Sequence, residues 1–145
     1  MPKLYLLHPA AVHFPIALLT AGLAGAWSAK LKGRPAWLSD AATWLLWIGT
    51  ASAWAAMGLG LLAEETAPHV PPAWRTLDTH QTLAYWTVGL FTGLSLWRRF
   101  LGKKAEWAFL ALWLAASGVL LGTGFFGGEL VFTHGMGTAA SAEGH

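Results

Sequence analysis

The chain has 145 residues, of which 55% are hydrophobic and only 11% are charged, with ten tryptophans and no cysteine. Water-soluble domains carry about 25% charged residues, so this composition excludes an ordinary soluble domain and also a disordered chain. The lack of cysteine excludes a disulfide scaffold, a cysteine-ligated metal and a thiol enzyme. The net charge of +2 comes from basic residues in two short clusters and gives no indication of nucleic-acid binding. We therefore predict a small, single-domain integral membrane protein.

Four stretches without Asp, Glu, Lys or Arg follow one another along the chain. Each is close to the roughly 20 residues that a helix needs to cross a bilayer, and helices satisfy their own backbone hydrogen bonds in lipid. We expect an all-α protein, an antiparallel four-helix bundle formed by residues 1–137 and followed by a flexible tail at 138–145. The expected spans are residues 9–29, 41–63, 80–97 and 107–128.

The charges of the connections orient this bundle. The connection after the first span carries three basic residues and the one after the third carries four, whereas the second connection is mainly acidic. By the positive-inside rule, the first and third connections face the cytoplasm. Both termini and the second connection then face the periplasm, which predicts a multi-pass protein of the bacterial inner membrane. No internal repeat is visible at the level of single residues.

The histidines stand out among the few polar residues. In the predicted orientation all six lie on the outer side, and four of them mark the ends of spans. His8 and His13 open the first span, His80 opens the third, and His134 follows the fourth. Ionisable groups at membrane depth are costly and tend to be functional. We take these four histidines as candidate cofactor ligands.

Helical geometry orders the four candidates by depth. His13 follows His8 by five residues, which places it about 7.5 Å deeper and about 140° further round the helix. His13 and His80 can therefore occupy a similar level, whereas His8 and His134 lie nearer the surface. Small side chains follow His13 and His80 at helical spacing and leave room for a flat, bulky group. Haem b fits this description, because its iron accepts axial histidine without a covalent link to cysteine.

The expected site is a bis-histidine haem site. We expect one or two haem b groups: His13 and His80 hold the first, and His8 and His134 are the pair for a second. Other pairings stay open, for example His8 with His80 and His13 with His134. Glu129 is a candidate to accept the N–H of a ligand histidine from outside the coordination sphere; the alternative is a solvated interfacial carboxylate.

Two motifs at opposite ends of the chain resemble the signatures of a known family. They are HPAAVHFP at residues 8–15 and GGELVFTHGMG at residues 127–137. Together they resemble the bacterial four-helix membrane proteins filed as Domain of Unknown Function 2231, which also tend to carry a histidine at the start of the third helix, as His80 does here. Phe132 and Met136 stand where that family usually has Tyr and Val. The resemblance implies a four-helix bundle whose motif histidines are similar to the haem ligands of membrane b-type cytochromes.

The leading interpretation is a b-type cytochrome-like electron-transfer subunit in the lipid bilayer. It would hold haem b near the periplasmic face and exchange electrons with quinol, a periplasmic cytochrome c or another redox partner, within a larger respiratory complex. One alternative is a Zn- or Cu-binding membrane module. Another is a cofactor-free structural subunit of a respiratory complex. No nucleophile–base set, phosphate loop or buried carboxylate pair is recognisable, so we do not expect an enzyme that works alone.

Overall fold

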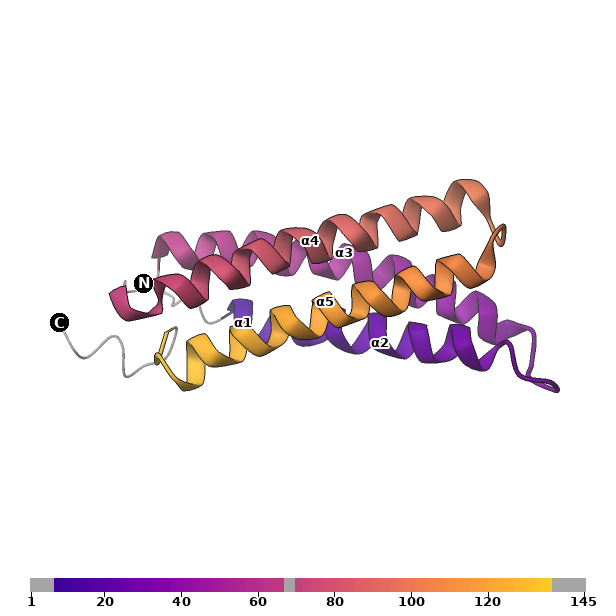
Figure 1. Ribbon diagram of the computed structural model, residues 1–145, viewed down its shortest axis with the longest axis horizontal. Helices are drawn as coiled ribbons and strands as arrows, with labels where there is room; N and C mark the ends of the chain where they lie inside the picture. Colours follow the sequence, from indigo (N-terminus) through magenta and orange to yellow (C-terminus); the bar gives the residue numbers. More distant parts are fainter. Residues whose placement is uncertain (1–6, 67–69, 137–145) are drawn as a thin grey trace.

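The structure, a computed structural model that describes residues 7–66 and 70–136, contains four long helices and two short ones (Figure 1). In chain order they are α1 (Leu7–Ala11), α2 (His13–Ser28), α3 (Trp37–Thr66), the 3₁₀ turn η2 (Pro71–Ala73), α4 (Trp74–Leu101) and α5 (Glu106–Phe132). The all-helical class is confirmed, and the described ranges contain no strand. The last three long helices extend beyond the expected spans because polar residues at their ends continue the helix. The expected tail at 138–145 lies outside the described residues.

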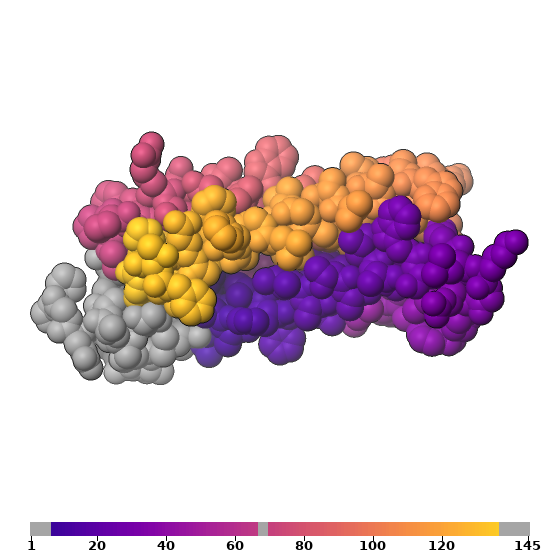
Figure 2. Space-filling model, turned by 60° about the horizontal axis from the view of Figure 1, so that its bottom comes forward, coloured from indigo at the N-terminus to yellow at the C-terminus, as the bar shows by residue number. Residues whose placement is uncertain are grey.

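The long helices form two hairpins that lie side by side. α2 packs on α3 and α4 packs on α5, while α3 contacts α4 and α2 contacts α5 across the bundle. Figure 2 shows the α5 surface lying along the α2 surface. Consecutive long helices reverse direction, so α1, the end of α3, the start of α4 and the end of α5 meet at one end of the bundle (Figure 1). We call this the histidine end, because it holds His8, His13, His80 and His134. The opposite end, with Lys30 and Arg98, is the basic end.

Three helical segments of the described chain are long and apolar enough to cross a membrane: Leu7–Ser28, Trp37–Thr66 and Glu106–Phe132. α4 has a similar length of 28 residues, but the charged and polar side chains in its first turns make it less apolar. That α4 also spans the bilayer stays a prediction.

The outward faces of the helices carry many exposed large apolar side chains. Examples from different helices are Ile48, Trp54, Leu112, Leu121 and Phe125, each at least 48% exposed. An exposed apolar surface of this extent is a liability in water and suits contact with lipid tails. The outer surface therefore agrees with a membrane location.

A tightly packed core fills the middle of the bundle. Leu19, Leu46, Phe91 and Trp113 are each at most 1% exposed. Gly49 of α3 lies directly against Leu19, and this contact lets α2 and α3 approach closely. The core separates the histidine end from the basic end.

Gly49→Ala is expected to destabilise the bundle by about 1–3 kcal/mol, the usual cost of overpacking a filled core. The added Cβ would lie 2.7 Å from both Cγ and Cδ2 of Leu19, a buried side chain with no free space to move into. Thermal unfolding in detergent measures the effect. Gly58→Ala on the same helix is the control, since a Cβ there meets nothing within 4 Å. Equal stability of the two variants would contradict the prediction.

One carboxylate joins three segments at the basic end. Arg98 donates from Nη1 to Oε2 of Glu106 at 3.0 Å and from Nη2 to Oε1 at 3.2 Å, and Lys30 Nζ lies 3.2 Å from the same Oε1. The Arg98 guanidinium also lies over the ring of Phe109, 4.0 Å from its centroid. These contacts hold α4, α5 and the chain just after α2 together.

Candidate functional site

A cavity of about 470 Å³ lies between the two hairpins at the histidine end. Volumes of about 300–1,000 Å³ are typical of sites for small molecules and cofactors. Small residues make up much of its wall, which explains why space remains between the helices; they include Ala53, Ala56, Gly60, Ala84, Gly124 and Gly127. The polar side chains that line it are His8, His13, Glu64, His80, Gln81, Tyr85, Thr87 and Thr123.

His8 reaches the cavity from the short helix α1. Pro15 has no N–H to donate to the carbonyl of Ala11, and the helix is interrupted between α1 and α2 at this level. The His8 ring turns toward α3, where its Nδ1 lies 2.9 Å from the backbone carbonyl oxygen of Ala56. The ring also lies against the backbone of Gly60, one helical turn further along α3.

His80 reaches the cavity from the other hairpin in the same way. Its Nδ1 lies 2.9 Å from the backbone carbonyl oxygen of Thr123 on α5. The ring lies against Gly127, again one turn beyond the carbonyl that holds it. The hydroxyls of Thr87 and Thr123 are 2.9 Å apart and link α4 to α5 beneath the ring.

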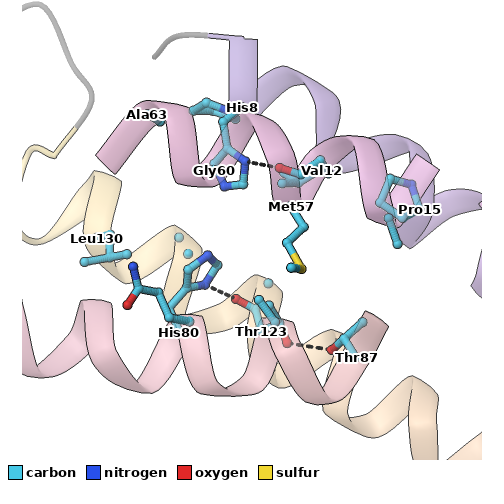
Figure 3. A pocket seen from close by; sticks show the side chains of 18 of the residues that line it. His8, Val12, Pro15, Met57, Gly60, Ala63, His80, Thr87, Thr123 and Leu130 are labelled. Atoms are coloured by element: carbon cyan, nitrogen blue, oxygen red, sulfur yellow. Dashed lines mark hydrogen bonds between the residues drawn. The ribbon is translucent and has the colours of Figure 1, made fainter. Parts of the chain in front are cut away.

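The two rings face each other across the cavity, with centroids 6.2 Å apart and planes at 79° (Figure 3). A carbonyl oxygen only accepts, so Nδ1 of each ring carries the hydrogen and Nε2 of the neutral ring keeps a free lone pair. The described residues provide no hydrogen-bond partner for either Nε2, and Figure 3 shows each ring directed toward the other. A histidine held through one nitrogen by a carbonyl, with the other nitrogen free, is the usual arrangement of a metal ligand.

The remaining sequence-predicted residues lie elsewhere at this end. His13 lines the cavity but is exposed, and its Nδ1 lies 2.8 Å from the carbonyl oxygen of Pro9 on the preceding helix α1. His134 is not among the lining residues, and its Nε2 lies 3.5 Å from Oγ1 of Thr76. The structure therefore brings His8, and not His13, to His80. The ligand pairs themselves stay predictions.

Glu129 does not reach the histidines through its side chain. Its backbone carbonyl accepts the N–H groups of Thr133 and His134, whereas its carboxylate makes no hydrogen bond or ion pair within the described ranges. No contact in this part of the chain supports its expected role beside a ligand histidine.

Sequence reasoning missed several residues of the cavity. Gln81 Nε2 donates to Oε2 of Glu64 at 2.6 Å and links α3 to α4. From the sequence, Glu64 counted only as one of the acidic residues of the second connection. Met57 points into the space beside the two rings (Figure 3). Gly60 and Gly127 give only a weak signal, a glycine inside an apolar helix.

The histidine pair is not part of a larger set of protein ligands. Over residues 7–66 and 70–136, no group of three or more His, Cys, Asp or Glu side chains could hold a metal ion. A closed structural zinc site needs four such ligands, and a catalytic one needs three. The described residues thus place two imidazoles, each with one free nitrogen, in a mainly apolar space.

Comparison with known families decides the classification. Residues 6–140, which include both histidine motifs in full, match DUF2231, described as a predicted membrane protein. The chain belongs to the DUF2231 family. No curated protein and no solved structure matches this DUF2231 chain. The family confirms the resemblance seen in the two motifs and establishes a membrane protein that contacts the lipid bilayer.

Proposed function

We propose that His8 and His80 are the two axial ligands of one haem b, and that the protein is an electron-transfer subunit. The 6.2 Å separation of the ring centroids carries this proposal. A coordinated nitrogen lies about 2 Å from its metal and the ring centre about 1 Å behind it, so rings on opposite sides of one ion are about 6 Å apart. Tetrahedral ligation would bring the centroids to about 5 Å. The observed distance favours two ligands on opposite sides.

The cavity around the rings supports the same proposal. Its walls are mainly apolar and rich in glycine and alanine, and the chain has no cysteine for covalent attachment of haem. Met57 is the side chain that has to turn aside, which its flexible thioether allows. Bound here, haem b would supply a one-electron couple, with His8 and His80 holding its iron.

The position of the site limits the electron-transfer partners. His8 and His80 lie at the end opposite the basic residues, so the positive-inside rule puts them near the periplasmic face of a bacterial inner membrane. The packed core below them contains no second pair of histidines. We propose exchange with quinol or a periplasmic cytochrome c, within a larger redox complex, rather than electron transfer across the whole bilayer.

Titration of the detergent-purified protein with haemin tests the proposal. We expect one haem per chain, with a six-coordinate low-spin spectrum that sharpens into split α and β bands after reduction by dithionite. A protein that stays colourless in the presence of haemin would overturn it, and such a result would favour a cofactor-free structural subunit.

Copper(I) is the second candidate ligand, because the Met57 thioether points into the space beside both imidazoles. Imidazole together with a soft thioether suits Cu(I) rather than zinc. Met57→Leu removes the sulfur and nearly conserves the volume. If copper is the ligand, this variant binds Cu(I) more weakly in competition with a chelator. If haem is the ligand, the variant still forms the six-coordinate low-spin complex, because both histidines remain.

A further inference from the structure

We infer that Gly60 and Gly127 are positioning residues that set the orientation of His8 and His80, an inference that rests on the proposed ligand role of this pair. Glycine has no side chain, so neither residue contributes a side chain to the space between the rings. Each instead leaves room for an imidazole beside the carbonyl that holds it.

The same local arrangement occurs twice. On α3, the Ala56 carbonyl accepts from Nδ1 of His8, and Gly60 lies four residues further on. On α5, the Thr123 carbonyl accepts from Nδ1 of His80, and Gly127 again lies four residues further on. A spacing of four residues puts the carbonyl and the glycine on one face of each helix, so each ring contacts both.

The repetition extends to the bundle. Each histidine belongs to the first arm of its hairpin and is held by the second arm, α3 for His8 and α5 for His80. The contacts between the hairpins are equivalent as well. The first arm of each hairpin contacts the second arm of the other, α2 with α5 and α4 with α3. The two hairpins therefore hold their histidines through equivalent contacts.

The fit of the rings explains why these positions are glycine. A glycine inside a helix costs about 0.5–1 kcal/mol relative to alanine, so helix stability alone favours alanine. A Cβ at residue 60 would lie 2.9 Å from Cε1 and 3.1 Å from Nδ1 of His8. A Cβ at residue 127 would lie 3.1 Å from Cε1 and 3.4 Å from Nδ1 of His80. The ring is the movable partner in both contacts, so alanine displaces the imidazole from its carbonyl, more strongly at residue 60.

Each helix offers a matched control glycine outside the cavity wall. A Cβ at Gly58 of α3 or at Gly118 of α5 meets nothing within 4 Å. Gly58→Ala and Gly118→Ala therefore change helix propensity as the test variants do but leave the imidazoles untouched.

The first experiment uses the ligand-free protein in detergent, with ¹⁵N-labelled histidine. In the wild type, His8 and His80 should give NMR signals of the Nδ1–H tautomer that the carbonyls impose. Gly60→Ala should remove this signature from His8, and Gly127→Ala should reduce it at His80, while both controls keep it. An unchanged tautomer in Gly60→Ala would overturn the inference, whether or not haem binds.

The second experiment measures haem affinity by titration. Loss of a group that orients a metal ligand commonly lowers metal affinity about 10–100-fold. We expect a loss in this range for Gly60→Ala, a smaller loss for Gly127→Ala, and none for Gly58→Ala or Gly118→Ala. Equal losses in a test variant and the control on the same helix would contradict the positioning role. If the wild type binds no haem while the tautomer signals shift as expected, the proposed function fails and the positioning role stands.

Discussion

His8→Ala and His80→Ala are each expected to lower haem affinity by more than the roughly 100-fold that loss of an outer-sphere partner can cost. Each substitution removes one of the two facing nitrogens and leaves a single axial ligand. The residual complex should be high-spin in place of the low-spin form. Titration with haemin, followed by absorption spectra before and after reduction, measures both effects.

His13→Ala and His134→Ala are the controls for this prediction. His13 is exposed and its ring is hydrogen-bonded to the Pro9 carbonyl of α1, and His134 lies outside the cavity wall. Both variants should retain the wild-type spectrum and affinity. Loss of haem in His13→Ala together with wild-type binding in His8→Ala would instead favour the pairing of His13 with His80.

Glu106→Gln is expected to destabilise the bundle by about 3 kcal/mol, because it leaves a buried cation without its counter-charge. Arg98 is 8% exposed and donates two hydrogen bonds to this carboxylate, besides a longer one of 3.4 Å to the backbone carbonyl oxygen of Gly102. Stacking on Phe109 remains but does not neutralise the guanidinium. Thermal unfolding in detergent measures the loss. Haem affinity should not change, since the substitution lies at the opposite end of the molecule.

Two further variants separate this effect from a general loss of charge. Lys30 also pairs with Glu106, but its side chain is 32% exposed, so Lys30→Met should cost less than about 1 kcal/mol. Replacing both Arg98 and Glu106 with leucine removes the unpaired charge and should recover much of the stability. A Glu106→Gln variant as stable as Lys30→Met would show that the ion pair contributes little.

Much of the fold could be predicted from the sequence, because the signals that define it are local. Apolar stretches of membrane length and charged connections mark the four long helices. The exact ends were less accurate, since helices continue into polar residues such as Arg75 and Asp78, where no apolar pattern exists. The interruption between α1 and α2 has a local cause in Pro15. The position of α1 depends in addition on its packing against α3, which no local pattern shows.

The candidate site was predicted in part. The sequence indicated that histidines gather at one end, because hydropathy and charge fix the side on which each one falls. It did not identify the facing pair. The orientation of His8 depends on a carbonyl 48 residues away, and that of His80 on one 43 residues away. Every residue has a backbone carbonyl, so the residue type does not show which carbonyl accepts a hydrogen bond from a histidine. Gly60 and Gly127 differ little in sequence from other glycines of apolar helices until their neighbours in space are known.

The dependence of His80 on α5 has a consequence for biogenesis. Synthesis proceeds from the N-terminus, so His8 meets its carbonyl on α3 well before Thr123 and Gly127 exist to orient His80. The facing pair is therefore complete only after the last helix has been inserted. The packed core separates the cavity from the basic end. Both histidines can therefore hold the proposed haem only after the whole bundle has formed, which makes its loading a late step of maturation.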